Sequence, residues 1–189
     1  EAITALIESG DHAIELGDAH AGPDRTIVVF SDPNCPHCRR FRQVAEDLAT
    51  NGWRVMIYPV SIVSPESAGY GAVQIALRDL APEAARSLYE ADAGDVADIT
   101  IAMKIAEQAG ASTKDLLTAI ARSGAYDAVE RNNLFFTNAG ATGAPSWIIG
   151  TSLYSGYLGA DAIEDLASSM EGDEEGVLDA EVLIDTKAE

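Results

Sequence analysis

The stretch T-I-V-V-F-S-D-P-N-C-P-H-C, residues 26–38, runs from an apolar segment directly into two cysteines. Residues 26–30 are β-branched or aromatic throughout, which predicts a buried central strand. Behind the cysteines, apolar residues recur at the i, i+3, i+4 and i+7 positions of one helix face: Phe41, Val44, Ala45 and Leu48. The Asn51-Gly52 pair then supplies a helix stop. We therefore expect the two cysteines at the corner between a strand and an amphipathic helix.

The flanking pattern extends this corner into an α/β domain. Residues 53–60 predict a second strand, which completes a β-α-β unit. Residues 13–16 predict a strand ahead of that unit, followed by a turn at residues 17–24. From residue 65 to residue 140 the pattern is helical, and its breaks indicate four or five helices, with the breaks near Ala81-Pro82, Gly94, Gly110-Ala111 and Gly124.

Strands are expected again at residues 147–149 and 152–157. Gly150-Thr151 separates the two, as in a tight hairpin. An amphipathic helix follows at residues 160–170. The predicted order is thus β-α-β, a helical insertion, then β-β-α.

The same pattern suggests three parts of the chain. Residues 1–10 predict a short helix, residues 11–170 a domain that holds both cysteines, and residues 171–189 an acidic tail. The tail holds eight acids against Lys187 alone, so it contributes −7 to the net charge of −19. Its segment 182–184 is apolar enough to add an edge strand.

The net charge of −19 bears on possible partners. A phosphate-binding surface needs clustered Lys and Arg, so we expect no nucleic-acid partner. The chain lacks any run of 18 apolar residues, so we expect no membrane insertion. The acidic excess is interpreted as a solubility feature, with attraction to basic or unfolded polypeptides as the alternative.

The only two cysteines, Cys35 and Cys38, are two residues apart. A disulphide between them closes too small a loop to stabilise a domain. A structural zinc or an iron–sulphur cluster would want four thiols. A covalent haem needs His directly after the second Cys, where Arg39 stands. We therefore expect no metal and no cofactor, and we assign the pair to redox chemistry.

Disulphide exchange needs a thiolate, so the site must lower the pKa of a thiol from its free value of about 8.5. Cys35 is expected at the amino end of a helix, where unpaired N–H groups favour negative charge, and Pro36 suits the first helical turn. His37 adds a donor or cation beside the sulphur. Three arginines follow within two turns and are either part of this basic cluster or a solvated helix face: Arg39, Arg40 and Arg42. One turn separates the sulphurs, so Cys38 can resolve the mixed disulphide that Cys35 forms.

Several segments resemble the catalytic domain of the bacterial periplasmic disulphide isomerases and chaperones of the DsbC/DsbG type, and DsbG more closely. They are F-S-D-P-N-C-P-H-C (30–38), S-P-E-S (64–67), A-P-E-A-A-R-S-L-Y-E-A (81–91) and G-A-T-G-A-P (140–145). The resemblance implies a thioredoxin-like fold with a helical insertion between its two halves. It makes Cys35 the nucleophile, Cys38 the resolving thiol and Pro145 a cis-proline opposite them. The expected site residues are Cys35, Cys38, His37 and Pro145 for catalysis, and Pro36, Ala144 and Gly143 for substrate binding.

The resemblance also implies a periplasmic protein whose signal peptide has been removed. Its substrates would be unfolded or misoxidised proteins, and its redox partner a membrane-bound protein. Three features depart from the DsbG pattern. Ala144 stands where threonine is usual, His37 gives the C-P-H-C motif more typical of DsbA oxidases, and residues 1–10 match only the end of the linker after a dimerisation domain. We therefore expect a monomer, and oxidase, isomerase and reductase activities all remain open.

Two other functions are alternatives to thiol–disulphide exchange, and four further residues are candidates for the site. A peptide-binding chaperone of the same fold with little redox turnover is the main alternative, and a cysteine hydrolase is weaker because a neighbouring thiol would inactivate its nucleophile by oxidation. His12 and His20 are interpreted as loop residues, since their spacing gives no support to a metal role with His37. Asp32 lies three residues before Cys35, close enough to influence the thiol, but an Asp-Pro turn is a sufficient explanation for it. Glu90 is interpreted as a surface carboxylate. Position 29 is valine, so the buried acid that some oxidoreductases place six residues before the first cysteine has no counterpart.

Overall fold

The computed structural model describes residues 10–91, 93–94 and 96–170, and a five-stranded sheet forms its centre. The strands lie in the order β1-β3-β2-β4-β5. Only β2 and β3 pair in parallel, and the other neighbours are antiparallel. The strand bounds are β1 (Ile14–Gly17), β2 (Thr26–Ser31), β3 (Arg54–Pro59), β4 (Ser146–Ile149) and β5 (Ser152–Ser155).

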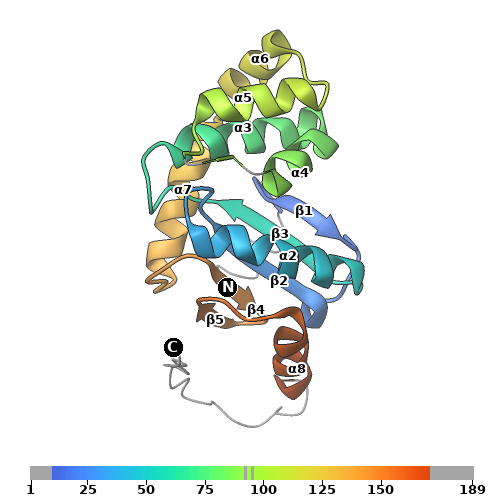
Figure 1. Ribbon diagram of the computed structural model, residues 1–189. Helices are drawn as coiled ribbons and strands as arrows, with labels where there is room; N and C mark the ends of the chain where they lie inside the picture. The colour runs from blue at the N-terminus through green and yellow to red at the C-terminus, as the bar shows by residue number, and fades with distance from the viewer. Residues whose placement is uncertain (1–9, 92, 95, 171–189) are drawn as a thin grey trace.

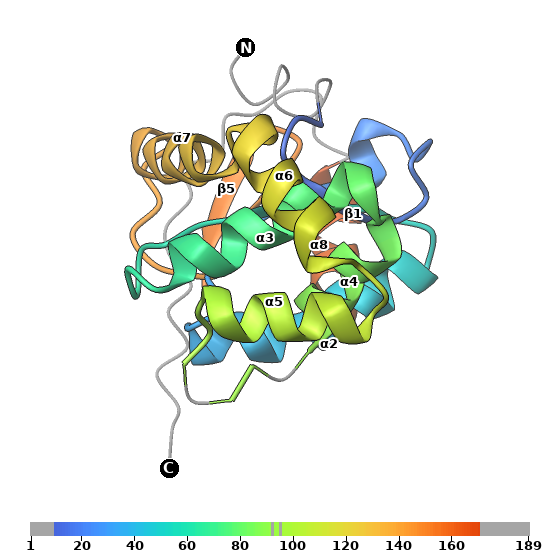
Figure 2. The same ribbon diagram turned by 90° about the horizontal axis from the view of Figure 1, so that it is seen from above.

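Helices surround the sheet and form a separate group at one end of the molecule (Figure 1). Helix α2 (Pro36–Thr50) connects β2 to β3 and α8 (Ala160–Met170) follows β5. Between β3 and β4 lie five helices, of which α3, α5 and α6 are grouped in the view from above (Figure 2). They are α3 (Ser67–Leu80), α4 (Pro82–Glu90), α5 (Ile99–Gln108), α6 (Thr113–Ser123) and α7 (Ala125–Asn138). The predicted α/β fold with its helical insertion is confirmed.

Two predicted details need adjustment. The last strand ends at Ser155 rather than at residue 157, and the turn before β2 contains a short 3-10 helix, η1 (Pro23–Arg25). The predicted hairpin is confirmed, since Ile149 pairs with Ser152 across it. Of the predicted helix at residues 1–10 only Gly10 is described, and the predicted edge strand at 182–184 lies outside the described residues.

The central strand β2 is buried along its whole length, as its continuous apolar run predicts. Alternate residues face opposite sides of the sheet. Ile27 and Val29 belong to the larger core, which α2, α3 and α8 cover. Phe30 faces the other side, where its ring lies 5.6 Å from that of Phe135 and 5.9 Å from that of Phe136, both from α7. Helices thus hold the strand that leads into the cysteines from both sides.

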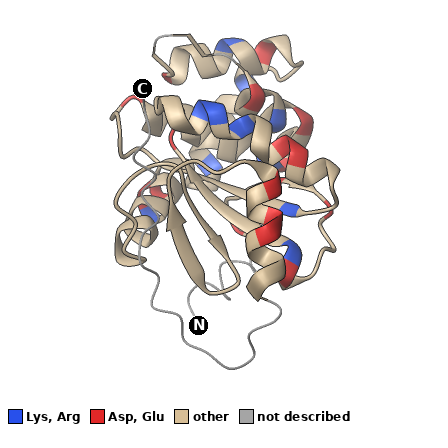
Figure 3. Ribbon diagram, turned by 60° about the horizontal axis from the view of Figure 1, so that its bottom comes forward, with Lys and Arg blue, Asp and Glu red and all other residues tan. Residues whose placement is uncertain are grey.

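Charged residues lie mainly on helices and loops, and the strands carry few (Figure 3). Among the described residues, no helix combines the length and the apolar character that a bilayer crossing requires. The same residues contain no group of three potential His, Cys, Asp or Glu metal ligands.

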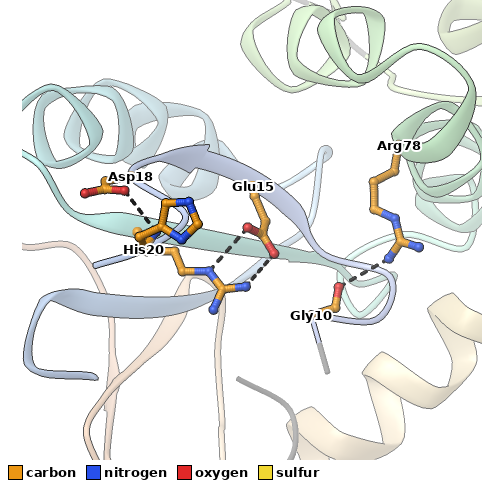
Figure 4. A network of polar contacts seen from close by, with 6 residues as sticks. Gly10, Glu15, Asp18, His20 and Arg78 are labelled. Atoms are coloured by element: carbon orange, nitrogen blue, oxygen red, sulfur yellow. Dashed lines mark hydrogen bonds and ion pairs between the residues drawn. The ribbon is translucent and has the colours of Figure 1, made fainter. Parts of the chain in front are cut away.

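Polar contacts fasten the edge strand β1 to its surroundings (Figure 4). Arg78 of α3 donates a 3.2 Å hydrogen bond to the Gly10 carbonyl, in the turn that precedes the strand. Glu15 of β1 binds Arg54 of β3 at 2.7 Å, a diagonal pair across the two antiparallel strands. These contacts fix β1 beside β3 at the edge of the sheet opposite β4 and β5.

Two glycines with positive φ allow a stability test of this edge. Gly17 has a φ of +79° and Gly52 a φ of +85°. A Cβ on Gly17 would lie 2.0 Å from the Trp53 carbonyl oxygen, whereas a Cβ on Gly52 would meet nothing within 4 Å. Gly52→Ala should therefore cost only the strain of the left-handed backbone, about 1–2 kcal/mol.

Gly17→Ala adds a backbone collision to that strain, and we expect it to cost at least about 3 kcal/mol of unfolding free energy. Urea unfolding of both variants measures the difference. Equal losses would mean that the close approach of β1 to the start of β3 is not present in solution.

Candidate active site

The cysteine pair lies where β2 ends and α2 begins. Cys35 is the amino-terminal cap residue of α2, with Pro36 at its first position. The Cys35 carbonyl accepts the first helical hydrogen bond, from Arg39 N–H at 3.1 Å. Cys35 is 4% exposed and Cys38 1% exposed, and both are free thiols in the structure. Pro36 and His37, which lie between them, are exposed.

The helix end and the second thiol lower the pKa of Cys35 to about 6. The largest contribution is a hydrogen bond from the Cys38 thiol, and the backbone N–H groups of Cys38 and His37 add to it. Burial and the charge of Asp32 act in the opposite direction. The predicted effect of the helix amino terminus is therefore confirmed, with Cys38 as a further and larger cause.

Cys38 behaves in the opposite way. Its hydrogen bond to Cys35, its burial and the charge on Cys35 raise its pKa well above the usual range of a thiol. The two sulphurs are thus unequal at neutral pH, with a thiolate at Cys35 and a protonated thiol at Cys38. This is the division between an attacking and a resolving cysteine that the sequence predicts.

The expected basic cluster does not surround the sulphur. Arg39 donates to the carbonyls of Pro33 at 3.2 Å and Gly94 at 2.8 Å, and Arg42 donates to the carbonyl of Ala91. Arg40 lies over the ring of Tyr157, 5.1 Å from its centroid. The contacts of these three side chains are thus with carbonyl groups and an aromatic ring rather than with the Cys35 sulphur.

The loop before β4 closes the other side of the thiols. The Ala144–Pro145 peptide bond is cis, as predicted. The Cys35 sulphur lies 3.2 Å from the Ala144 carbonyl oxygen, to which its thiol donates a hydrogen bond when it is protonated. Pro145 is buried and Gly143 exposed, and the Gly143 carbonyl accepts a hydrogen bond from Ser146 Oγ at 2.6 Å. The structure thus brings Ala144 and Pro145 to Cys35, and the binding of substrate by this loop stays a prediction.

Asp32, which the sequence explains as part of an Asp-Pro turn, is buried at the site. It is 0% exposed, and its Oδ1 accepts from Asn34 N–H at 2.9 Å and from Ser67 Oγ at 2.6 Å. Its Oδ2 accepts from the N–H groups of Ile62 and Val63, both at 2.8 Å. The first of these bonds is the turn that an Asp-Pro pair predicts. The other three reach residues about 30 positions away, and no local pattern signals them.

Asn34 adds a second long-range connection. Its side chain pairs with the backbone of Ala97, accepting from the N–H at 2.7 Å and donating to the carbonyl at 2.9 Å. The same amide donates to Ser67 Oγ at 2.8 Å. A polar network of Asp32, Asn34 and Ser67 therefore joins the active-site turn to the helical insertion.

The remaining candidates lie away from the thiols. His12 Nε2 is 3.0 Å from Arg131, and the backbone N–H of His20 donates to Asp18 Oδ1. Glu90 pairs with Arg86 four residues earlier on α4. These placements agree with the interpretation of all three as loop or surface residues.

Comparison with known proteins places the fold. Residues 10–167 match the thioredoxin family. The chain belongs to this family. With a cysteine pair at the start of α2 and a cis-proline against it, this thioredoxin-family protein is a thiol–disulphide oxidoreductase. A search among curated proteins gave no match.

Solved structures agree at the level of the fold. A thioredoxin-like oxidoreductase from Silicibacter pomeroyi is 22% identical, with a TM-score of 0.78, over 89% of this chain and 96% of that one. The thiol-disulfide exchange protein alpha-DsbA2 from Wolbachia pipientis is 19% identical, with a TM-score of 0.74, over 90% and 98%. A periplasmic thioredoxin-like protein from Salmonella enterica is 19% identical, with a TM-score of 0.62, over 89% and 97%.

These comparisons refine the resemblance seen in the sequence. Membership of the thioredoxin family is confirmed. The finer likeness to DsbG gains no support, since the solved structures named here include an alpha-DsbA2 and no DsbC or DsbG. The C-P-H-C motif with His37, noted as more typical of DsbA, points the same way.

The hydrogen bond from Cys38 can be tested with a matched pair of variants. Cys38→Ala removes the donor, so the midpoint of Cys35 ionisation should rise by about one pH unit or more above its value near 6. Cys38→Ser keeps a hydroxyl donor at the same position and should stay much closer to the wild type. Thiolate absorbance at 240 nm against pH measures both.

The depressed pKa also sets a pH dependence. Alkylation of Cys35 by iodoacetamide should be fast above pH 7 and slow as the pH falls through about 6, where the thiolate is protonated. Stabilisation of the reduced protein by this thiolate should likewise be lost as the pH falls through about 6. A midpoint at or above pH 8 for Cys35 in the wild type would contradict the described site.

Proposed function

We propose that the chain is an oxidant that donates the Cys35–Cys38 disulphide to reduced cysteine pairs of unfolded proteins. The observation that carries this proposal is the stabilised Cys35 thiolate, held by two backbone N–H groups and the Cys38 thiol. A stabilised thiolate favours the reduced form of the site over its disulphide. A strong oxidant of this kind is one whose reduced form is the more stable.

In the proposed reaction Cys35 forms the mixed disulphide with the substrate and Cys38 is the leaving group. A substrate thiolate attacks Cys35 Sγ of the disulphide, the S–S bond breaks, and Cys38 leaves and takes up a proton. A second substrate thiolate then attacks the substrate sulphur of the mixed disulphide and releases Cys35 as the thiolate that the helix end stabilises. The substrate is oxidised by two electrons and the cysteine pair is reduced by two. A further oxidant, which we propose to be a membrane-bound partner protein, must restore the disulphide.

Apolar side chains beside the site support an unfolded protein as substrate. Ile62 is 36% and Val63 53% exposed, and their backbone N–H groups bind Asp32 next to the cysteines. Val96, 51% exposed, precedes the Ala97 that Asn34 holds. Exposed apolar side chains at one place suit the apolar segments that a folded substrate would bury.

We further propose that the protein acts in the periplasm. A similar structure is described as a periplasmic thioredoxin-like protein, and disulphides persist in oxidising compartments outside the cytosol. Cell fractionation with an antibody to the chain tests this location, and recovery in the cytosol would contradict it.

Oxidative refolding tests the main proposal. The oxidised chain is mixed with a reduced, unfolded protein that needs one disulphide, and the yield of folded product is followed. We expect stoichiometric oxidation by the wild type, less than about 1% of that rate with Cys35→Ser, and a reduction potential above about −200 mV, toward the DsbA value near −120 mV.

Three outcomes would contradict the proposal. A potential near −270 mV, that of thioredoxin, would indicate a reductase instead. Equal assistance to refolding by the wild type and by Cys35→Ser would favour the chaperone alternative. Rapid rearrangement of a scrambled protein by a catalytic amount of the reduced chain would indicate an isomerase.

A further inference from the structure

Asp32 contacts both the thiol pair and the loops around it. Its backbone N–H donates to Cys38 Sγ at 3.4 Å, and its carbonyl accepts from Cys35 N–H at 3.0 Å. Its carboxylate binds the loop after β3 through Ile62 and Val63, at 2.8 Å each. One residue thus touches the active-site turn by its backbone and the adjoining loop by its side chain.

The hydrogen-bond partners of the Asp32 carboxylate indicate that it is ionised. The four groups around its oxygens, three backbone N–H groups and the Ser67 hydroxyl, all donate to it. Ser67 Oγ is free to donate because it accepts from Asn34 Nδ2 at 2.8 Å. An ionised carboxylate only accepts, so this set of donors fits the charged form of Asp32. The four donors are neutral, so a net negative charge lies buried on the residue whose backbone contacts both cysteines.

That charge acts differently on the two redox states. In the reduced state Cys35 carries a negative charge, which the carboxylate repels. In the disulphide neither sulphur is charged, and the repulsion is absent. The carboxylate therefore opposes the helix amino terminus and shifts the balance toward the disulphide.

We propose that Asp32 is a positioning residue that limits the oxidising strength of the Cys35–Cys38 pair, since its buried carboxylate disfavours the charged reduced form while its backbone holds both cysteines in the turn. The proposal deepens the function proposed above, and it rests only on the cysteine pair being redox-active. It assigns Asp32 no proton transfer, because all four of its contacts are occupied by donors.

Equilibration with glutathione tests this without a protein substrate. One glutathione disulphide accepts two electrons from the thiol pair, its S–S bond breaks, the Cys35–Cys38 bond forms, and two glutathione thiols result. Asp32→Asn removes the charge and keeps nearly the same volume. We expect it to shift the equilibrium toward reduced protein by about threefold to tenfold, a more oxidising pair, and to lower the midpoint of Cys35 ionisation.

Ser67→Ala is the matched control, because it removes one hydrogen bond of the network and leaves the charge. Its equilibrium with glutathione should stay within about twofold of the wild type. Asp32→Ser is a second neutral replacement, used if the asparagine amide disturbs the four donors. Circular dichroism and urea unfolding confirm that each variant measured is folded.

The outcomes distinguish an effect of the Asp32 charge from an effect of the hydrogen bonds that hold the turn. A folded neutral variant at Asp32 with an unchanged or less oxidising equilibrium would overturn the proposal. An equal shift in Ser67→Ala would also overturn it, since the effect would then come from loosening the turn rather than from the charge. A more oxidising Asp32→Asn that fails to oxidise unfolded proteins would uphold this inference and contradict the proposed function instead.

Discussion

The meeting of one sulphur with the first turn of α2 is the interaction on which the site depends. Cys35 takes the cap position of the helix, where backbone N–H groups have no helical acceptor and a negative charge supplies one. This works only if the helix starts directly where the buried strand β2 ends. The packing of β2 from both sides, by α2 and α3 on one face and by α7 on the other, keeps that junction in place.

Two opposing influences meet at this junction. The helix end and the Cys38 thiol favour charge on Cys35, while burial and the Asp32 carboxylate disfavour it. The helix end that favours the charge belongs to the β-α-β unit itself. The position of the Asp32 carboxylate, which disfavours the charge, depends on residues of the insertion. The redox behaviour of the pair therefore depends on the whole domain, even though only two residues separate the cysteines in the sequence.

Local patterns in the sequence predicted much of this structure. The apolar run of β2, the helix face of α2 and the breaks between the inserted helices follow from periodicity and from turn residues. The burial of Asp32 was not predicted, because a local Asp-Pro turn is a sufficient explanation for an aspartate at this position. The directions of Arg39 and Arg42 were also missed, since their carbonyl partners in the 91–94 segment lie about 50 residues away. A single sequence carries no signal for such pairings.

The separation between the two halves of the site has a consequence for the growing chain. The Cys35 thiol finds the Ala144 carbonyl 109 residues further on, and β2 pairs with β4 across a similar distance. During synthesis, or during passage through a membrane pore from the amino end, the cysteines emerge long before the segment that covers them. For that interval they are open to other thiols and disulphides. Fast folding after residue 149 has been synthesised would shorten the time for which the reactive cysteines are exposed.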